Sequence, residues 1–221
     1  MNNLPLYQFL EIDAINSNST LSDMDKMLFS MCAILGMSEP ELDKVSVKTF
    51  NKLSKKTTRI LTKKVEQITR PPFVGEYKIE YDTAKLTFGQ YVELNHFLRG
   101  NIYVNSPFIV ASVASSSEKT THPERVEYLK QQKTGYVLAA VNDVIMEFIA
   151  FNKKYDKLFG LNKDVVGDEA YIHPFNRNYG WIYSATAVAD YEKISLDEAY
   201  NLPVIQALND LTYLKAKQDY D

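Results

Sequence analysis

The sequence holds little cysteine, glycine or proline, and each shortage narrows the class of protein that it can encode. Cys32 is the only cysteine among 221 residues, which excludes an internal disulfide and a zinc site built from thiolates. Glycine and proline number eight each, and the hydrophobic share of 45% is enough for a core, which excludes a wholly disordered chain. No uncharged apolar run reaches eighteen residues, and residues 1–20 lack the basic start of a secretory signal. We therefore expect neither a membrane-spanning helix nor a leader.

Patterns typical of catalytic or metal sites are also scarce. Glu93 and His96 stand three residues apart, as in di-iron bundles, but the second Glu-x-x-His pair of such a centre is absent from the sequence. Asp168 and Glu169 form a lone acidic pair, which is weak evidence for acid–base or Mg²⁺ chemistry. The sequence contains no phosphate-binding glycine loop, dinucleotide fingerprint or Gly-x-Ser-x-Gly motif. It thus predicts no enzyme, no catalytic residue, no metal and no cofactor.

Positive charge, by contrast, is concentrated in one segment. Residues 44–70 contain nine basic residues and one acid, Glu66, and so have a net charge of +8. Because the whole chain has a net charge of −3, the remainder must be at −11. A basic segment is therefore set in an acidic protein, and this polarity calls for an explanation.

Apolar and basic side chains recur in this segment at three- and four-residue steps on opposite sides, which predicts one amphipathic helix. Its basic face consists of Lys44, Lys48, Lys52, Lys55, Lys56, Arg59 and Lys63. Such a face is most often only solvated, but it could also bind an acidic partner chain or nucleic-acid phosphates. Aromatic residues do not interleave with these lysines, which weakens the single-strand nucleic-acid interpretation.

The rest of the pattern predicts a mainly α protein with a small β element (α+β), arranged as a helical bundle around a long central helix. The capping-box signature, Ser or Thr followed three residues later by Glu or Gln, predicts helix starts at Ser38, Thr87 and Ser195, and Ser22 is a further N-cap. The apolar run from Val137 to Phe159 predicts the central helix, since it is hydrophobic over more than half of its circumference.

Two prolines divide the predicted chain. Pro71-Pro72 cannot continue a helix, so we expect a helical N-terminal region over 1–70 and a core over 71–221. Alternation over residues 73–81 predicts a strand with one buried face. Residues 102–113 fit either a strand or a buried helix.

Within residues 73–217, two passages share helix starts and aromatic anchors with a known group of proteins. In the first, a strand over Glu76–Ile79 precedes Leu86-Thr87-Phe88-Gly89-Gln90-Tyr91 at a helix start. The second combines Tyr179-Gly180-Trp181-Ile182-Tyr183 with a capped helix and a last helix of the form Leu208-x-x-Leu211-x-Tyr213-x-Lys215. Both passages resemble tail-assembly-chaperone-like proteins of bacteriophages.

The resemblance implies a non-enzymatic phage structural or assembly protein that acts through protein–protein contacts. It would be a tail assembly chaperone or a virion ring component of the tail, neck or head–tail connector, in the host cytoplasm during assembly, with retention in the virion left open. The implied partners are other phage structural or tail proteins and further copies of this chain, without a membrane. Tyr179, Trp181 and Tyr183 are the predicted aromatic contact residues, and the fifteen tyrosines suit surfaces that become buried on assembly.

The basic helix lies outside the resembling passages. We expect it to meet the acidic surface of a neighbouring subunit. Two alternatives stay open. The first is a nucleic-acid-binding module that uses residues 44–70, although nucleic acid is the less favoured partner. The second and weaker alternative is a metal-dependent enzyme that uses Glu93 with His96, or Asp168 with Glu169.

Overall fold

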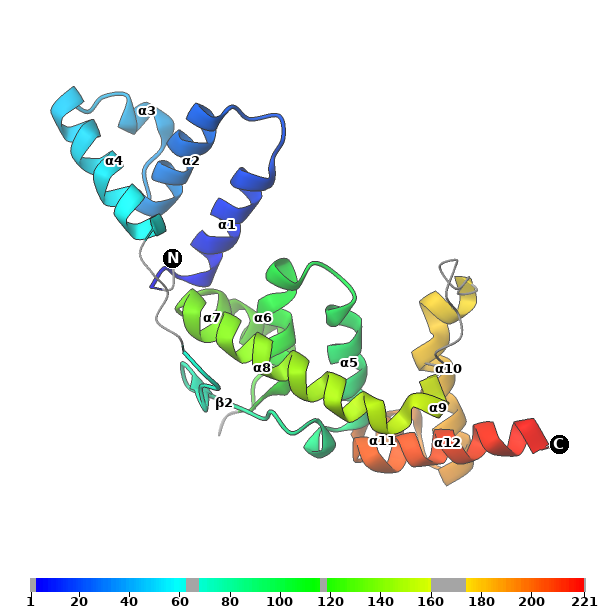
Figure 1. Cartoon of the computed structure of the whole chain (residues 1–221). Helices are drawn as coiled ribbons and strands as arrows, with labels where there is room; N and C mark the ends of the chain where they lie inside the picture. The colour runs from blue at the N-terminus through cyan, green and yellow to red at the C-terminus, as the bar shows by residue number, and fades with distance from the viewer. Residues whose placement is uncertain (1–2, 63–67, 116–118, 160–173, 221) are drawn as a thin grey trace. The chain divides into compact units, whose positions relative to one another are not determined.

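The computed structural model describes residues 3–62, 68–115, 119–159 and 174–220. It is mainly helical and contains one small antiparallel sheet, which confirms the predicted fold class (Figure 1). The chain forms two compact units, each built from two stretches of sequence. Unit 1 is Met1–Ile79 with Asn101–Val141, and unit 2 is Glu80–Gly100 with Asn142–Asp221. The two units are defined by which residues contact one another and not by whether either folds alone. The domain boundary expected after residue 70 therefore stays a prediction.

Unit 1 begins with α1 (Leu6–Ser17), α2 (Asp23–Leu35), α3 (Glu39–Leu42) and α4 (Val47–Thr62). The predicted caps are present: Asp25 N donates to Ser22 Oγ at the start of α2, and Gly36 ends that helix in the left-handed region. Leu4, Ile12 and Ala33 form a buried cluster, and Ile60 and Leu61 of α4 pack against it. The apolar face of α4 thus turns inward, as the amphipathic pattern requires.

The sheet of unit 1 consists of β1 (Phe73–Val74), β2 (Tyr77–Ile79) and β3 (Ala114–Ser115), in that order and all antiparallel. Val74 pairs with Tyr77, and Ile79 pairs with Ala114. The stretch expected as one strand is therefore a hairpin that turns at Gly75, where φ is +64°. The predicted buried face is confirmed, since Tyr77 and Ile79 are buried.

The ambiguous segment 102–113 is a helix, α6 (Ile102–Val113), and it packs against α7 (His122–Lys130). Asn101 caps α6, because its Oδ1 accepts hydrogen bonds from the backbone N–H groups of Tyr103 and Val104. Pro107 within the helix cannot donate to the Tyr103 carbonyl, and the Ser106 hydroxyl donates to that oxygen instead at 2.7 Å. This substitute hydrogen bond allows a proline inside a buried helix.

Unit 2 contains η1 (Thr83–Lys85), α5 (Phe88–Leu98), η2 (Lys153–Tyr155), α9 (Asp156–Phe159), α10 (Pro174–Glu192), α11 (Leu196–Asn201) and α12 (Val204–Tyr220). The predicted capping boxes at Thr87 and Ser195 open α5 and α11. Phe88 N donates to Leu202 O at 2.8 Å, and this backbone bond ties the start of α5 to the turn before α12. Helix α10 packs against both α11 and α12.

The predicted central helix is α8 (Thr134–Asn152), which contributes residues to both units and ends at Asn152, where η2 begins. Within the described residues, Thr134–Tyr155 is the one helical stretch long and apolar enough to span a membrane, judged by length and composition alone. The same stretch supplies the buried side chains of Val137, Val144 and Phe148. Because a core helix meets the same criterion, the absence of a membrane partner stays a prediction.

Candidate protein-binding surfaces

The basic face of α4 is a continuous cationic surface. Lys44 precedes the helix, and the side chains of Lys44, Lys48, Lys52, Lys55, Lys56 and Arg59 are all exposed. None of these six forms an ion pair with a carboxylate of the described residues. The seventh predicted residue of this face, Lys63, lies outside the described residues.

The charge of the neighbouring elements is of the opposite sign. Residues 1–43 contain seven acids and one base, whereas residues 44–62 contain six bases and no acid. Three of these acids lie near enough to Cys32 for their charges to act on its thiol: Glu11 of α1, Glu39 of α3 and Asp43, which follows α3. All three act on the Cys32 thiol, because burial and then the charges of Glu39, Asp43 and Glu11 raise the pKa of this thiol. We call Glu11, Glu39 and Asp43 the acidic patch.

A pocket of about 450 Å³ between α1 and α2 adjoins the acidic patch. Its lining is mostly apolar, with Ile15, Leu21 and Phe29 as the large side chains. Glu11 of the acidic patch and Cys32 also line it. The arrangement joins an apolar recess to carboxylates at its rim, which is suited to a long cationic side chain with an aliphatic stem.

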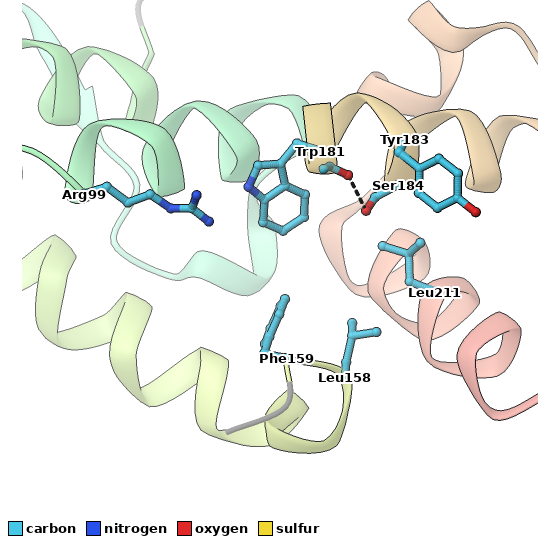
Figure 2. Close-up of a pocket in the computed structure, with 8 residues that line it drawn as sticks. Arg99, Leu158, Phe159, Trp181, Tyr183, Ser184 and Leu211 are labelled. Atoms are coloured by element: carbon cyan, nitrogen blue, oxygen red, sulfur yellow. Dashed lines mark hydrogen bonds between the residues drawn. The ribbon is translucent and has the colours of Figure 1, made fainter. Parts of the chain in front are cut away.

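Unit 2 has an aromatic pocket of about 330 Å³, built from four separate elements (Figure 2). It is lined by Arg99 after α5, Leu158 and Phe159 of α9, Gly180, Trp181, Tyr183 and Ser184 of α10, and Leu211 of α12. Figure 2 shows the Trp181 ring facing Phe159, with Leu158 and Leu211 beside them. Arg99 is the one charged side chain among these lining residues.

Trp181 is held firmly in the wall of the aromatic pocket. Its Nε1 donates a hydrogen bond to Asn95 Oδ1 at 3.2 Å. Its ring meets the rings of Phe88, Tyr91 and Phe159 edge-on, with centroids 5.6 to 6.4 Å apart. These contacts fix the rotamer of Trp181 before any partner arrives.

The other two aromatic residues predicted for binding lie at the surface of α10. Tyr183 lines the pocket and is 67% exposed. Tyr179 is 52% exposed, one helical turn earlier, and does not line it. Ile182, between them in the sequence, is 51% exposed. The structure therefore brings two of the three predicted residues into one pocket, at the edge of an apolar helical surface.

The sequence did not predict a binding role for six lining residues of the aromatic pocket: Arg99, Leu158, Phe159, Gly180, Ser184 and Leu211. Their local patterns predict ordinary helix positions, and only the packing of α5, α9 and α10 against α12 brings them together. No signal within a few residues of Arg99 relates it to Trp181.

Of the residues considered for enzymatic chemistry, the structure describes Glu93 and His96. Glu93 and His96 are both exposed on α5, and the His96 ring packs against Phe97. The described part of the chain contains no group of three or more His, Cys, Asp or Glu side chains placed to hold a metal ion. Asp168 and Glu169 lie outside the described residues.

Comparison of this chain with known proteins gave no match to a family model, to a curated protein or to a solved structure. The resemblance to phage tail assembly proteins therefore depends on the two sequence passages alone.

Proposed function

We propose that this protein is a non-enzymatic assembly protein of a bacteriophage tail or head–tail connector, and that it works by binding other protein chains. The aromatic pocket of unit 2 carries the proposal. Trp, Tyr and Arg are the residues that most often dominate the binding energy of protein interfaces, and Trp181, Tyr183 and Arg99 meet here around one recess.

The construction of the pocket supports a binding role. Trp181 is fixed by three rings and a hydrogen bond, so little side-chain entropy remains to be lost when a partner binds. Around it, Tyr183 and Ile182 present exposed surface for a partner to cover. The volume of about 330 Å³ accommodates one large apolar side chain, and Arg99 favours a carboxylate next to it.

The resemblance points to the same place. Its second passage contains Trp181 and Tyr183 in α10 and Leu211 in α12, all of which line the aromatic pocket. A chaperone or ring component would use such a pocket to hold a segment of another tail protein.

The test is a binding experiment with the tail proteins encoded beside this gene, the tape-measure protein among them. Isothermal titration calorimetry should detect binding of at least one by the unmodified protein. Tyr183→Ala and Arg99→Ala should each weaken that binding about tenfold or more, which corresponds to about 1.4 kcal/mol. Tyr213→Ala is the matched control, because Tyr213 is 54% exposed on α12 but does not line the pocket. Absence of binding to every tail protein, or equal affinities for all variants, would refute the proposal.

Nucleic-acid binding is the second candidate, and the exposed cations of α4 favour it. The net charge of −6 on residues 1–43 opposes it, because these acids reduce the attraction of this region for a polyanion. Titration of duplex DNA at 50 and 200 mM salt decides the question. A phosphate-binding face loses affinity steeply between these concentrations, with a slope of about −0.9 in log K against log salt for each phosphate contacted. No binding at 50 mM salt excludes this candidate.

A further inference from the structure

We infer that this protein binds a second copy of itself, with the basic face of α4 in one copy seated on the acidic patch and the adjoining pocket of the next. The inference extends the proposed assembly role by naming one partner. It uses unit 1 only and does not involve the aromatic pocket.

Charge complementarity is the first argument. Residues 1–43 have a net charge of −6, and residues 44–62 have a net charge of +6. Opposite and equal charges on separate surfaces of one region are expected to attract copies of the same chain to one another. Because such a region has little net charge, it attracts a DNA phosphate backbone less strongly than it attracts a protein surface with charges of both signs.

Within the described residues, the basic face of α4 forms no ion pair with the acidic patch of its own chain. Helix α4 packs against α2, and its Ile60 and Leu61 lie on the buried cluster. The basic side chains occupy the opposite side of the helix and point to solvent. A second copy can therefore bring its carboxylates to this exposed face.

The acidic patch offers more than charge. Glu11 belongs both to the patch and to the wall of the 450 Å³ pocket, so a lysine that enters can place its ammonium group beside this carboxylate. The aliphatic stem of that lysine would then lie on Ile15 and Phe29. Such a contact buries apolar surface in addition to pairing charges.

The two surfaces are different, so the contact is heterologous. A bound pair retains one free acidic patch on one copy and one free basic face on the other, so the association continues until a ring closes or a filament grows.

The first test uses complementary charge reversals, measured by light scattering coupled to size exclusion. The basic-face variant carries Lys48→Glu, Lys52→Glu and Lys55→Glu, and the patch variant carries Glu11→Lys, Glu39→Lys and Asp43→Lys. At 50 mM salt the unmodified protein should have a mass that is a multiple of 25.3 kDa, which falls towards 25.3 kDa at 500 mM salt because the charges are screened. Each variant alone should remain at 25.3 kDa at 50 mM salt.

An equimolar mixture of the two variants should regain the higher mass at 50 mM salt, because each basic surface then finds an acidic one. Circular dichroism confirms that both variants are folded. An unmodified protein that stays at 25.3 kDa overturns the inference. Variants that keep the mass of the unmodified protein, or a mixture that does not associate, overturn it as well.

The second test locates the contact. Cys32 lines the pocket beside the acidic patch and is the only cysteine of the chain, so a thiol reagent reports on this site alone. At 50 mM salt, Cys32 should react at least about fivefold more slowly in the associated unmodified protein than in the monomeric basic-face variant. Equal rates in the two proteins would place any self-association elsewhere and would overturn the inference.

Different results would refute the proposed function and the self-association. Tyr183→Ala alters the aromatic pocket in unit 2 and should leave the mass at 50 mM salt unchanged. Loss of self-association in this variant would contradict the assignment of the contact to unit 1. Conversely, charge reversal at Lys48, Lys52 and Lys55 should leave binding of a tail protein to the aromatic pocket within about twofold.

Discussion

Gly75 is a position where one methyl group should have a large and calculable effect. This glycine turns the hairpin between β1 and β2 with φ of +64°, and an added Cβ would lie 2.6 Å from both Cε1 and Oη of Tyr128. Tyr128 is already engaged, because its hydroxyl oxygen accepts a hydrogen bond from Glu76 N at 3.2 Å and its ring meets Tyr77 edge-on at 5.1 Å. Gly75→Ala must therefore displace Tyr128 from both contacts.

Two costs add in Gly75→Ala. An alanine in the left-handed region costs about 1 kcal/mol. Displacement of Tyr128 forfeits one hydrogen bond and one aromatic pair, worth about 1 kcal/mol each. The expected loss is about 3 kcal/mol. Gly36 provides the matched control, since its φ is +63° but nothing lies within 4 Å of an added Cβ. Gly36→Ala should therefore cost only the first term, about 1 kcal/mol.

Thermal unfolding followed by circular dichroism measures both variants. In a chain of this size 1 kcal/mol lowers Tm by about 3 °C, so we expect shifts of about 3 °C for Gly36→Ala and about 9 °C for Gly75→Ala. In a Tyr128→Ala background the collision with Tyr128 is absent, and only the end of the flexible Gln132 side chain, whose Cδ lies 2.9 Å from the added Cβ, has to move. Gly75→Ala should then cost nearly as little as Gly36→Ala. Equal shifts for the two glycine variants, or an unchanged cost in the Tyr128→Ala background, would refute the reasoning.

Two predictions concern unit 2. Burial, and then the negative charge of Glu192, raise the pKa of Asp210 to about 6, so the folded state keeps the proton that the unfolded state releases near its ordinary value of 3.8. The stability that this group contributes therefore falls as pH rises from about 4 to about 6. Asp210→Asn should remove that fall and stabilise the protein at pH 7. Urea unfolding of both proteins measures this, and a difference between their midpoints that stays constant across this pH range would contradict the assignment. Trp181→Phe loses the hydrogen bond to Asn95 and should lower the free energy of unfolding by about 1 to 2 kcal/mol. Trp181→Ala should lower it by about 3 kcal/mol, and Tyr183→Ala, at an exposed position, by less than about 0.5 kcal/mol. Urea unfolding measures all three. The reverse order would show that Trp181 is not part of the core.

The helix starts were predictable because their signals are local. At Ser38, Thr87 and Ser195 the N-cap residue and its Glu or Gln partner lie three residues apart. The whole capping box is therefore contained in four consecutive residues. The amphipathic helix over α4 was predictable for a similar reason, since its two faces repeat every three or four residues.

The hairpin and α6 are two elements whose structure the local sequence pattern did not fully predict. The alternation at Tyr77 and Ile79 indicated the buried face of β2, but the turn at Gly75 depends on close packing against Tyr128 of α7. Segment 102–113 is almost wholly apolar, and it lacks the periodicity that separates a helix from a strand. Packing against α7 and the Ser106 hydrogen bond decide in favour of the helix.

The sequence by itself determined the helix starts, the basic face of α4 and the aromatic character of α10, because each of these is encoded by residues within one element. Only the tertiary structure decided that Arg99, Phe159 and Leu211 surround Trp181, and that Glu11, Glu39 and Asp43 gather near Cys32. These residues belong to separate helices, and side-chain packing between the helices sets their distances. No spacing along the chain encodes such distances, so both surfaces proposed for binding became complete only in the folded protein.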